Sequence, residues 1–446
     1  MIISPFIEVV SDPLNLDHDI IWNPLSSGCT VVRAKAGKFD SLDNCLSVDT
    51  QSFLQKERFI FDDNSAAFAT VSHVTKSKFV ETERLVLMPT GACQLSCGSS
   101  KEGGYCGQIH TNDRLTKEDL REVKSKALEI CKSSQCKRLE LTFFGGEPTI
   151  NFPFILDALS LCRIAIDEFR SKNFERNITL CSSIVSNGVL LTGPRFKDLW
   201  NAGVRRYEVT LDGVGRIHDL RRPGKDGSGS FERIASNLND IANLISGGFE
   251  CDFVVRCNVD VRNIDGLPQL LKFLEVNQLV PPLGFYIAPV RNWGLKSAAD
   301  SFGSRVHFAK WESFVFHWLV RRGLMPALIP SELQRTCIAA SPKPNVLGPD
   351  RNWYFCTEAP LVEKLLMPTE QLPKRWQDLN IDQWHQKLST DEMPCNRCKY
   401  LPVCGGSCPK DWLSGEKPCP PFIDNIKDRL RLFSIAKEKE IPTLKF

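Results

Sequence analysis

Ten of the eighteen cysteines in this 446-residue chain fall into two groups with short, patterned spacing. The front group is Cys93, Cys97 and Cys106, and the rear group is Cys337, Cys356, Cys395, Cys398, Cys404, Cys408 and Cys419. The first residues lack a basic start followed by a long apolar run, so we expect no signal peptide and a cytoplasmic protein. Cytosolic thiols stay reduced, so grouped cysteines predict metal ligation rather than disulfides.

Each group can hold more than one kind of metal centre. Three thiolates can hold a 4Fe–4S cubane by three irons and leave the fourth iron open to a substrate or cofactor. Zinc is the alternative for the front group, since His110 could complete a closed Cys3His set. In the rear group, the spacing Cys-x2-Cys-x5-Cys-x3-Cys over residues 395–408 suits a zinc ribbon as well as an iron–sulfur cluster.

The elements that position these cysteines alternate between strand and helix. Apolar helical spacing occupies 116–133, with Thr116 as the expected N-cap, and also 152–169 and 232–245. The expected strands are 84–89, 137–144, 178–186, 205–211, 252–261 and 284–290. This order predicts an α/β fold with a parallel sheet, a partial (β/α)6 TIM-like barrel two units short of closure. In such sheets the chemistry lies at the carboxyl ends of the strands.

Three domains are expected along the chain. Residues 1–83 form a small α+β domain with strand-like pieces at 29–34, 58–63 and 68–74 and a helical candidate at 42–55. Residues 84–325 form the partial barrel, and residues 326–446 form a cysteine-rich domain with a closing helix near 427–440. The net charge of +3 and the lack of an eighteen-residue apolar run predict neither nucleic-acid nor membrane binding.

Further polar motifs follow the later strands. Gly145-Gly146-Glu147-Pro148 follows 137–144, Ser186-Asn187-Gly188 ends the next strand, and Thr210-Leu211-Asp212-Gly213 closes the fourth, with His218 and Arg222 shortly after it. Glycine permits close backbone approach, and a carboxylate suits an ammonium partner. Taken singly, the first motif could be an ordinary turn and Arg222 a surface salt bridge.

Together these motifs resemble the radical S-adenosylmethionine (SAM) superfamily, whose signature is Cys-x3-Cys-x2-Cys with an aromatic residue before the last cysteine. This chain keeps the first spacing and has Tyr105 before Cys106, but it places eight residues between the second and third cysteines. The resemblance implies a SAM-binding 4Fe–4S cluster on the front group. It also implies contacts to SAM from Tyr105, Gly145, Gly146, Glu147, Ser186, Asn187, Thr210, Arg222 and Ile287, although Ile287 could equally be plain core.

The rear cysteines resemble the SPASM domain, which carries two auxiliary 4Fe–4S clusters. By that resemblance Cys337, Cys356 and Cys408 hold the first, and Cys395, Cys398, Cys404 and Cys419 hold the second. The first then has three thiolates, so the resemblance implies one open or non-cysteine-ligated iron.

The family resemblance also implies the activity. Such enzymes cleave SAM to a 5′-deoxyadenosyl radical, and SPASM members mostly modify peptides or proteins. We expect oxidative modification, mainly crosslinking, of a ribosomally synthesised precursor peptide (RiPP maturation), with flavodoxin or ferredoxin as electron donor. Residues 1–83 could bind a leader peptide as an added strand, or serve as a structural cap.

Glu358, shortly after Cys356, is a candidate proton acceptor, unless it is an exposed loop carboxylate. Two other functions remain open. One is a sulfatase-maturase-type oxidase that forms formylglycine, and the other is a non-catalytic multi-zinc protein.

Overall fold

The chain divides into two compact units in the computed structural model. The core unit comprises Glu81–Gly303, Ser341–Leu379 and Phe446; the flanking unit comprises Met1–Val80, Ser304–Ala340 and Asn380–Lys445. The structure describes residues 2–4, 6–15, 17–26, 28–33, 52, 54–61, 81–97, 105, 108, 110–133, 136–290, 304–330, 337–340, 343–361, 393–413 and 417–442.

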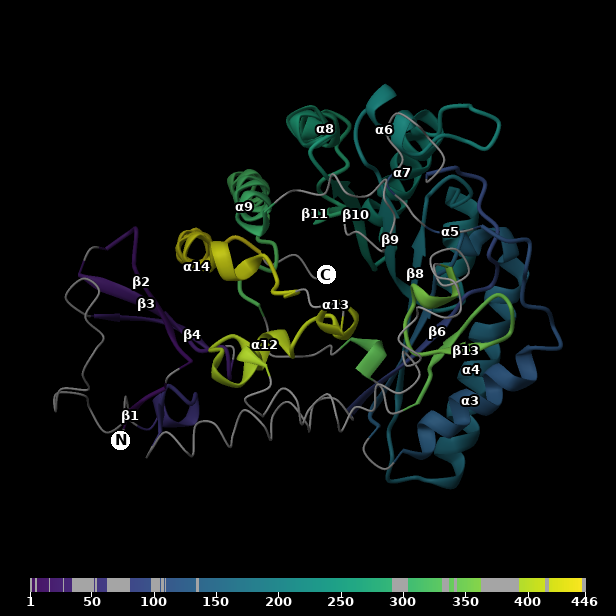
Figure 1. Ribbon diagram of the computed structural model, residues 1–446, viewed down its shortest axis with the longest axis horizontal. Helices are drawn as coiled ribbons and strands as arrows, with labels where there is room; N and C mark the ends of the chain where they lie inside the picture. Colours follow the sequence, from purple (N-terminus) through teal and green to yellow (C-terminus); the bar gives the residue numbers. More distant parts are fainter. Residues whose placement is uncertain are drawn as a thin grey trace. The chain divides into compact units, whose positions relative to one another are not determined.

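An eight-stranded sheet in the order β11-β10-β9-β8-β7-β6-β12-β13 organises the core unit (Figure 1). Its first six strands along the chain are β6 (Thr82–Leu87), β7 (Arg138–Phe143), β8 (Thr179–Ser186), β9 (Val204–Thr210), β10 (Asp252–Val259) and β11 (Gly284–Pro289). All neighbours among these six pair in parallel. The six predicted strands and the parallel α/β class are therefore confirmed.

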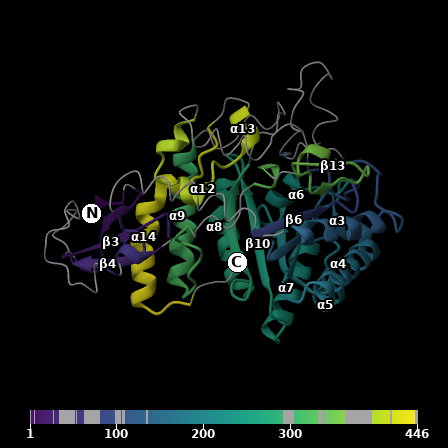
Figure 2. The ribbon, with the colours of Figure 1, turned by 90° about the horizontal axis from the view of Figure 1, so that it is seen from below.

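Helices connect successive strands, as parallel pairing requires. They are α3 (Leu120–Lys132), α4 (Phe152–Lys172), α5 (Gly193–Asn201), α6 (Arg216–Arg221), α7 (Phe231–Ser246) and α8 (Leu267–Val276), with 3-10 turns at Pro148–Asn151 and Ile264–Gly266. Figures 1 and 2 show α3, α4, α5 and α7 on one side of the strands. The strand residues of that face, such as Ile184, Val209 and Val255, are buried. The other face is left for polar side chains.

The N-cap expected for the first helix is wrong. Helix α3 begins at Leu120 with Asp119 as its N-cap. The Asp119 carboxylate accepts hydrogen bonds from the backbone and hydroxyl of Thr116, at 2.6 and 3.1 Å. Thr116 therefore starts a turn before the helix, because its hydroxyl is held by this carboxylate.

Among the described residues, one helical stretch, Pro148–Lys172, is long and apolar enough to cross a membrane by length and composition. It includes α4, the crossover between β7 and β8. Helix α4 packs against α3 and buries eight side chains, Ile155 and Leu159 among them. Its apolar face is thus covered within the core unit.

A short hairpin of β12 (Val346–Leu347) and β13 (Trp353–Tyr354) extends the core sheet beyond β6. Strand β12 pairs in parallel with β6, with Val346 opposite Val86. A Cβ on Gly348 would lie 2.6 Å from Asp350 Oδ1, so the tight turn between the two strands favours glycine. This hairpin was not predicted from the sequence, and the segment containing Cys356 belongs to the core unit.

The flanking unit contains a three-stranded antiparallel sheet in the order β2-β3-β4. Its strands and helices are β1 (Ile2–Ile3), β2 (Glu8–Ser11), β3 (His18–Trp22), β4 (Cys29–Arg33), β5 (Ile60–Phe61), α9 (Arg305–Arg321), α12 (Leu401–Cys404), α13 (Pro409–Leu413) and α14 (Phe422–Glu438), with 3-10 turns at Ile338–Ala340 and Pro394–Arg397. Trp22, Tyr400 and Leu430 belong to one buried cluster. The closing helix is confirmed as α14, whereas 68–74 and most of 42–55 lie outside the described residues.

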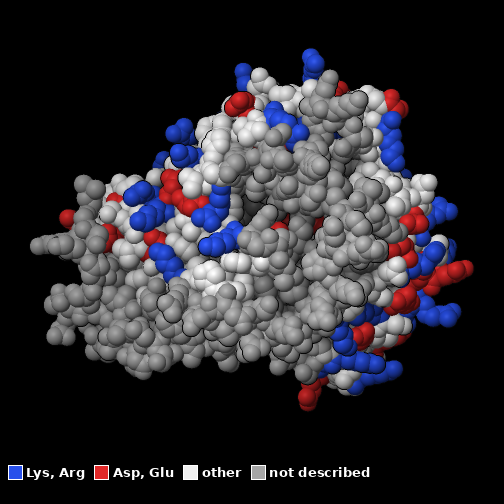
Figure 3. Space-filling model, viewed as in Figure 1, with Lys and Arg blue, Asp and Glu red and all other residues white. Residues whose placement is uncertain are grey.

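Charges of both signs alternate over the α3–α4 region of the face drawn in Figure 3. Residues of α3 and α4 also form ion pairs, Lys124 with Glu168 at 2.6 Å and Glu129 with Lys343 at 2.5 Å. Such exposed pairs contribute little to stability, at most about 1 kcal/mol each.

Candidate functional site

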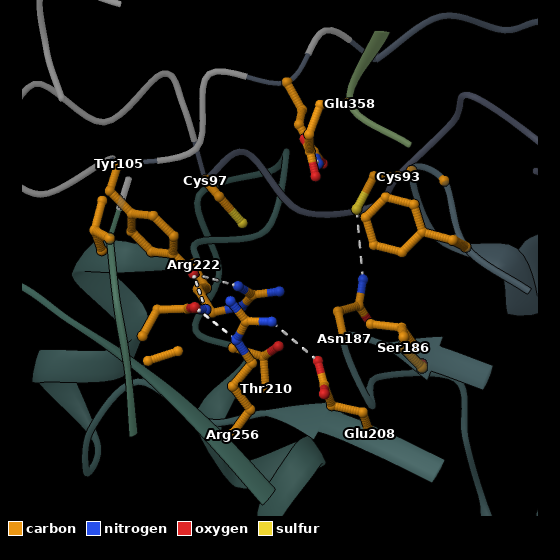
Figure 4. A pocket seen from close by; sticks show the side chains of 18 of the residues that line it. Cys93, Cys97, Tyr105, Ser186, Asn187, Glu208, Thr210, Arg222, Arg256 and Glu358 are labelled. Carbon is orange, nitrogen blue, oxygen red and sulfur yellow. Dashed lines mark hydrogen bonds and ion pairs between the residues drawn. The ribbon is translucent and has the colours of Figure 1, made fainter. Parts of the chain in front are cut away.

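A pocket of about 360 Å³ lies at the carboxyl ends of the core strands (Figure 4). Ten of the residues predicted from the sequence line it: Cys93, Cys97, Tyr105, Gly145, Gly146, Ser186, Asn187, Thr210, Arg222 and Glu358. They come from loops and strands up to 265 residues apart in sequence, from Cys93 to Glu358. Two predicted residues, Glu147 and Ile287, do not line it, and Cys106 lies outside the described residues.

The two described cysteines of the front group are buried in the loop that follows β6. Cys93 is 5% exposed and Cys97 is 4% exposed. Asn187 Nδ2 donates to Cys93 Sγ at 3.4 Å, and the backbone N–H of Leu95 donates at 3.5 Å. Burial raises the pKa of Cys93 to about 11 and also raises the pKa of Cys97. Both thiols therefore hold their protons until a metal displaces them.

Two glycines let the cysteine loop approach the end of β7. A Cβ on Gly146 would lie 2.4 Å from the carbonyl oxygen of Ala92. Gly145 adopts φ +126°, and a Cβ there would lie 2.9 Å from the carbonyl oxygen of Thr90. Only glycine fits this close backbone approach, which forms one wall of the pocket.

Glu147 is fully buried behind that wall. Its carboxylate accepts hydrogen bonds from Ser186 Oγ at 2.9 Å, from the N–H of Asn187 at 2.7 Å, and from both the backbone and the hydroxyl of Thr149. Burial raises its pKa, while these hydrogen bonds oppose the rise. In the structure, Glu147 thus joins the carboxyl ends of β7 and β8.

Tyr105 lies at the centre of a hydrogen-bond network on the opposite wall. Its hydroxyl donates to Asp212 Oδ2 at 2.6 Å and accepts from Arg222 Nη1 at 2.6 Å and from Asn258 Nδ2 at 3.0 Å. Arg222 also lies 3.6 Å from Asp212 Oδ2. The residue next to Cys106 is therefore fixed by a carboxylate after β9, an amide of β10 and the arginine after α6.

A buried histidine, His218, is hydrogen-bonded to residues that adjoin this network. His218 Nδ1 accepts from the N–H of Asp212 at 3.0 Å, so the network assigns the ring proton to Nε2, 3.1 Å from Ser230 Oγ. Ser230 in turn donates to the carbonyl oxygen of Arg222 at 2.7 Å. Burial lowers the pKa of His218 to about 4, so the ring is neutral near pH 7. It therefore serves as a positioning residue for Asp212 and Arg222.

Adjacent Arg221 has a different environment from Arg222. Its side chain is 3% exposed and donates twice to Asp260, at 3.0 and 3.1 Å. Arg222, by contrast, lines the pocket. Of the two neighbouring arginines, Arg221 is thus buried in an ion pair and Arg222 faces the pocket.

Ile287 lies in β11, where successive side chains point to opposite faces. It is buried, and the neighbouring residues Ala288, Pro289 and Val290 line the pocket instead. Register explains this, because Ile287 pairs with buried Cys257, whereas Ala288 pairs with the pocket residue Asn258. In the structure, Ile287 occupies a core position.

Glu358 lies on the pocket wall, half-buried, where its carboxylate accepts from Gln108 Nε2 at 3.1 Å. His110 also lines the pocket. Within the described part of the chain, no three His, Cys, Asp or Glu side chains are close enough to hold a metal ion. His110 therefore does not complete a site with Cys93 and Cys97.

The rear cysteines belong to both units. Cys395, Cys398, Cys404 and Cys419 interact electrostatically in the flanking unit. Burial, together with the other three thiols, raises the pKa of Cys404 to about 12. Burial, together with Cys398 and Cys419, raises the pKa of Cys395 to about 11. Cys337 and Cys408 also belong to the flanking unit, whereas buried Cys356 belongs to the core unit. The four cysteines assigned to the second auxiliary cluster, all among the described residues, thus belong to one unit, although no three of them are close enough together to hold a metal ion.

Comparison with known proteins identifies the pocket-bearing region. Residues 88–255 match the model of the radical SAM superfamily. Over these residues the chain is similar to radical SAM proteins, which use SAM and a 4Fe–4S cluster. The match runs from the end of β6 into β10 and so spans most of the pocket.

Individual relatives show how much of the chain is similar to known proteins. A serine-type anaerobic sulfatase-maturating enzyme of Bacteroides thetaiotaomicron is 27% identical over 176 residues, which cover 37% of this chain and 38% of that relative. The structure of native anSMEcpe with bound AdoMet and Kp18Cys peptide is 17% identical, with a TM-score of 0.55 over 80% of this chain and 99% of that chain. Streptococcus suis SuiB aligns with a TM-score of 0.49 at 15% identity, over 94% of this chain and 98% of that one. The radical SAM fold is shared with anSMEcpe.

The described residues fit the cofactors that this superfamily uses. Two buried thiols face a glycine wall at which Cβ atoms would clash, and Thr210 and Arg222 supply donors suited to a carboxylate. When bound, the cluster and SAM supply a carbon radical that can take a hydrogen atom from an unactivated C–H bond. The residues that line the pocket would orient these groups and shield them from water.

The sequence did not point to four polar residues of the pocket: Gln108, Glu208, Arg256 and Asn258. Glu208 precedes Thr210 by two residues in β9, so strand alternation already places it on the same face. Arg256 and Asn258 alternate in the same way along β10. The signal available in the sequence was the alternation of side chains along each strand, which repeats every two residues, rather than a motif.

Proposed function

We propose that this radical SAM enzyme is a peptide maturase that oxidatively modifies, mainly by crosslinking, side chains of a ribosomally synthesised precursor peptide. The observation that carries the proposal is the pocket itself. The cysteine loop, the glycine wall, Thr210 and Arg222 converge on one cavity at the strand ends. The similar fold of anSMEcpe, which binds AdoMet together with a peptide, supports a peptide substrate.

Two auxiliary 4Fe–4S clusters form the second part of the proposal. The four interacting thiols of Cys395, Cys398, Cys404 and Cys419 support one of them. Cys337, Cys356 and Cys408 would hold the other, with one iron open or bound by a non-cysteine ligand. A dehydrogenating crosslink removes two hydrogens from the peptide. One would leave as an atom to the deoxyadenosyl group of SAM, and the other as a proton and an electron, with the auxiliary clusters accepting the electron.

Glu358 is the residue that we assign to the proton. Its carboxylate lies on the pocket wall, where Gln108 Nε2 donates to it at 3.1 Å, and a base must lie within hydrogen-bond reach of the proton that it removes. Flavodoxin or ferredoxin would supply the electron that starts each turnover. The edge of the β2-β3-β4 sheet offers backbone groups to which a leader peptide could add as a strand.

Anaerobic reconstitution followed by metal analysis tests the cofactor content. We expect about twelve iron atoms and about twelve sulfide ions per chain from three four-iron clusters. Stoichiometric zinc with no iron absorbance would overturn the proposal. Mass spectrometry of a co-expressed precursor peptide tests the reaction, and a loss of two hydrogens within the peptide is expected.

A sulfatase-maturase activity is the second candidate, favoured by the 27% identity to the Bacteroides enzyme over part of the chain. Formylglycine in a co-expressed sulfatase, with no change in the precursor peptide, would select this candidate.

A further inference from the structure

The pocket contains a second cation that the SAM contacts do not use. Arg256 of β10 lines it together with Glu208 of β9. Arg256 precedes Asn258 by two residues, and Glu208 precedes Thr210 by two. Both residues therefore lie one pleat deeper along their strands than the strand-end groups expected to hold SAM.

Arg256 is held in one orientation. Its Nε donates to Asn258 Oδ1 at 2.9 Å, and its Nη1 donates to Glu208 Oε1 at 3.2 Å. Glu208 is fixed in turn, since its Oε2 accepts from the hydroxyl of Tyr286 at 2.6 Å. The guanidinium also lies over the Tyr286 ring, 5.9 Å from its centroid. The geometry of the pair is thus set before any ligand binds.

The pair presents donors rather than acceptors to the cavity. Both carboxylate oxygens of Glu208 already accept a hydrogen bond. The hydrogen bonds to Asn258 and Glu208 use two of the five N–H donors of a guanidinium. The Arg256 side chain remains 35% exposed, and Figure 4 shows it joined to Glu208 at the pocket. An anion therefore suits this position better than a cation.

A second ion-paired arginine on the same face of the sheet provides a contrast. Arg206 ion-pairs with two carboxylates, Glu140 at 3.3 Å and Asp252 at 3.6 Å, and it does not line the pocket. Arg256 ion-pairs with one carboxylate and does line it. Because Arg84 shares Glu140 with Arg206, both arginines have about one carboxylate each, and they differ in that Arg256 faces the cavity.

We propose that Arg256 binds a carboxylate of the substrate peptide and so places an acidic residue or the peptide C-terminus beside the reacting carbon. This inference rests on the proposed peptide maturase function. The planar guanidinium fork matches a carboxylate in two-point geometry. Glu208, Asn258 and Tyr286 are then the positioning residues that aim the fork.

Three pools of synthetic hexapeptides, otherwise random and N-acetylated, test the inference on the reconstituted holoenzyme. The first has a fixed central Glu and an amidated C-terminus, the second a central Gln and an amidated C-terminus, and the third a central Gln and a free C-terminal carboxylate. The readout is 5′-deoxyadenosine formed above the rate without peptide.

For the wild-type enzyme we expect the first or the third pool to exceed the second by about tenfold, the scale of one charge-assisted hydrogen bond. The better pool identifies whether the carboxylate is a side chain or a C-terminus. Arg256→Gln is expected to abolish the ratio between pools, and Arg256→Lys to keep part of it. Arg206→Gln is the matched control and is expected to keep the wild-type ratio.

Equal stimulation by all three pools would overturn the role of Arg256 and leave the peptide maturase proposal intact. So would a ratio that survives in Arg256→Gln. Loss of SAM affinity in Arg256→Gln, with the ratio between pools unchanged, would show that Arg256 binds SAM rather than the peptide. No stimulation by any pool, alongside normal SAM cleavage, would overturn the peptide proposal and the carboxylate site together.

Discussion

Two polar layers lie on the same face of the core sheet, and they differ in what surrounds them. The lower layer, near the amino ends of the strands, consists of Arg84, Glu140, Arg206 and Asp252, linked at 3.3 to 3.6 Å. The upper layer, at the carboxyl ends, holds Thr210, Arg222 and Arg256. Both contain ion pairs, but only the upper layer has a cavity and loops that bring buried thiols to it. The two layers therefore differ in the loops that form the cavity and not in the presence of charged residues.

The largest effect should come from the cysteine loop of the upper layer. Cys97→Ala should lower the iron content by about four atoms per chain and reduce SAM cleavage to background, since three thiolates hold the cluster. Iron analysis and 5′-deoxyadenosine measurement check both outcomes. Cys131→Ala, which changes a fully buried cysteine of α3, is the control and should retain the iron. Equal activity of the Cys97→Ala and Cys131→Ala variants would show that the cysteine loop is not required for SAM cleavage.

His218 gives the upper layer a dependence on pH. Its pKa in the folded protein, about 4, lies below its ordinary value of 6.5, so the unfolded chain takes up a proton first as the pH falls. Stability from this group is constant above about pH 6.5 and falls below it, by roughly 1 kcal/mol at pH 5.5 and about 3 kcal/mol by pH 4. Urea unfolding at pH 7.5 and 5.5 measures this loss. His218→Gln should show less of it, and an identical loss would rule out His218 as the cause.

Arg222→Gln should weaken SAM binding about 10- to 100-fold, because one charge-assisted hydrogen bond to the carboxylate is lost. Equilibrium dialysis with labelled SAM provides the measurement. Arg206→Gln, the matched change in the lower layer, should bind SAM as the wild type does. A comparable loss in both variants would show that the effect is general destabilisation.

Glu140→Gln should have the smallest effect, and on stability only. Arg84 and Arg206 share this carboxylate, and all three side chains are about one-third exposed or less. Removing its charge should cost about 1 kcal/mol in the free energy of unfolding. SAM cleavage should stay unchanged, and a large loss of activity without unfolding would assign the lower layer a catalytic role.

The sequence foresaw the features that depend on local pattern. Six strands followed from apolar runs, and the cysteine loop, the glycine pair, Thr210 and Arg222 followed from the resemblance to the radical SAM superfamily. Cys93, Cys97, the two glycines, Thr210 and Arg222 line the pocket. Strand ends are readable because parallel strands carry their loops to the same edge.

The features that the sequence did not reveal depend on register or distant pairing. Ile287 and Ala288 differ by one residue, and only the pairing with β10 decides which of them faces the pocket. The pairing of Val346 with Val86 joins segments 260 residues apart in sequence. The burial of Glu147 depends on Thr149, Ser186 and Asn187 together. None of these leaves a local signature.

Reductive cleavage of SAM by the reconstituted protein tests the central claim most directly. With dithionite as electron source and no oxygen, the wild-type protein should convert SAM to methionine and 5′-deoxyadenosine in equal amounts. The Cys97→Ala variant should produce neither. Bound zinc in place of iron, or wild-type protein that forms no 5′-deoxyadenosine while carrying its full iron content, would contradict the assignment of this pocket to radical SAM chemistry.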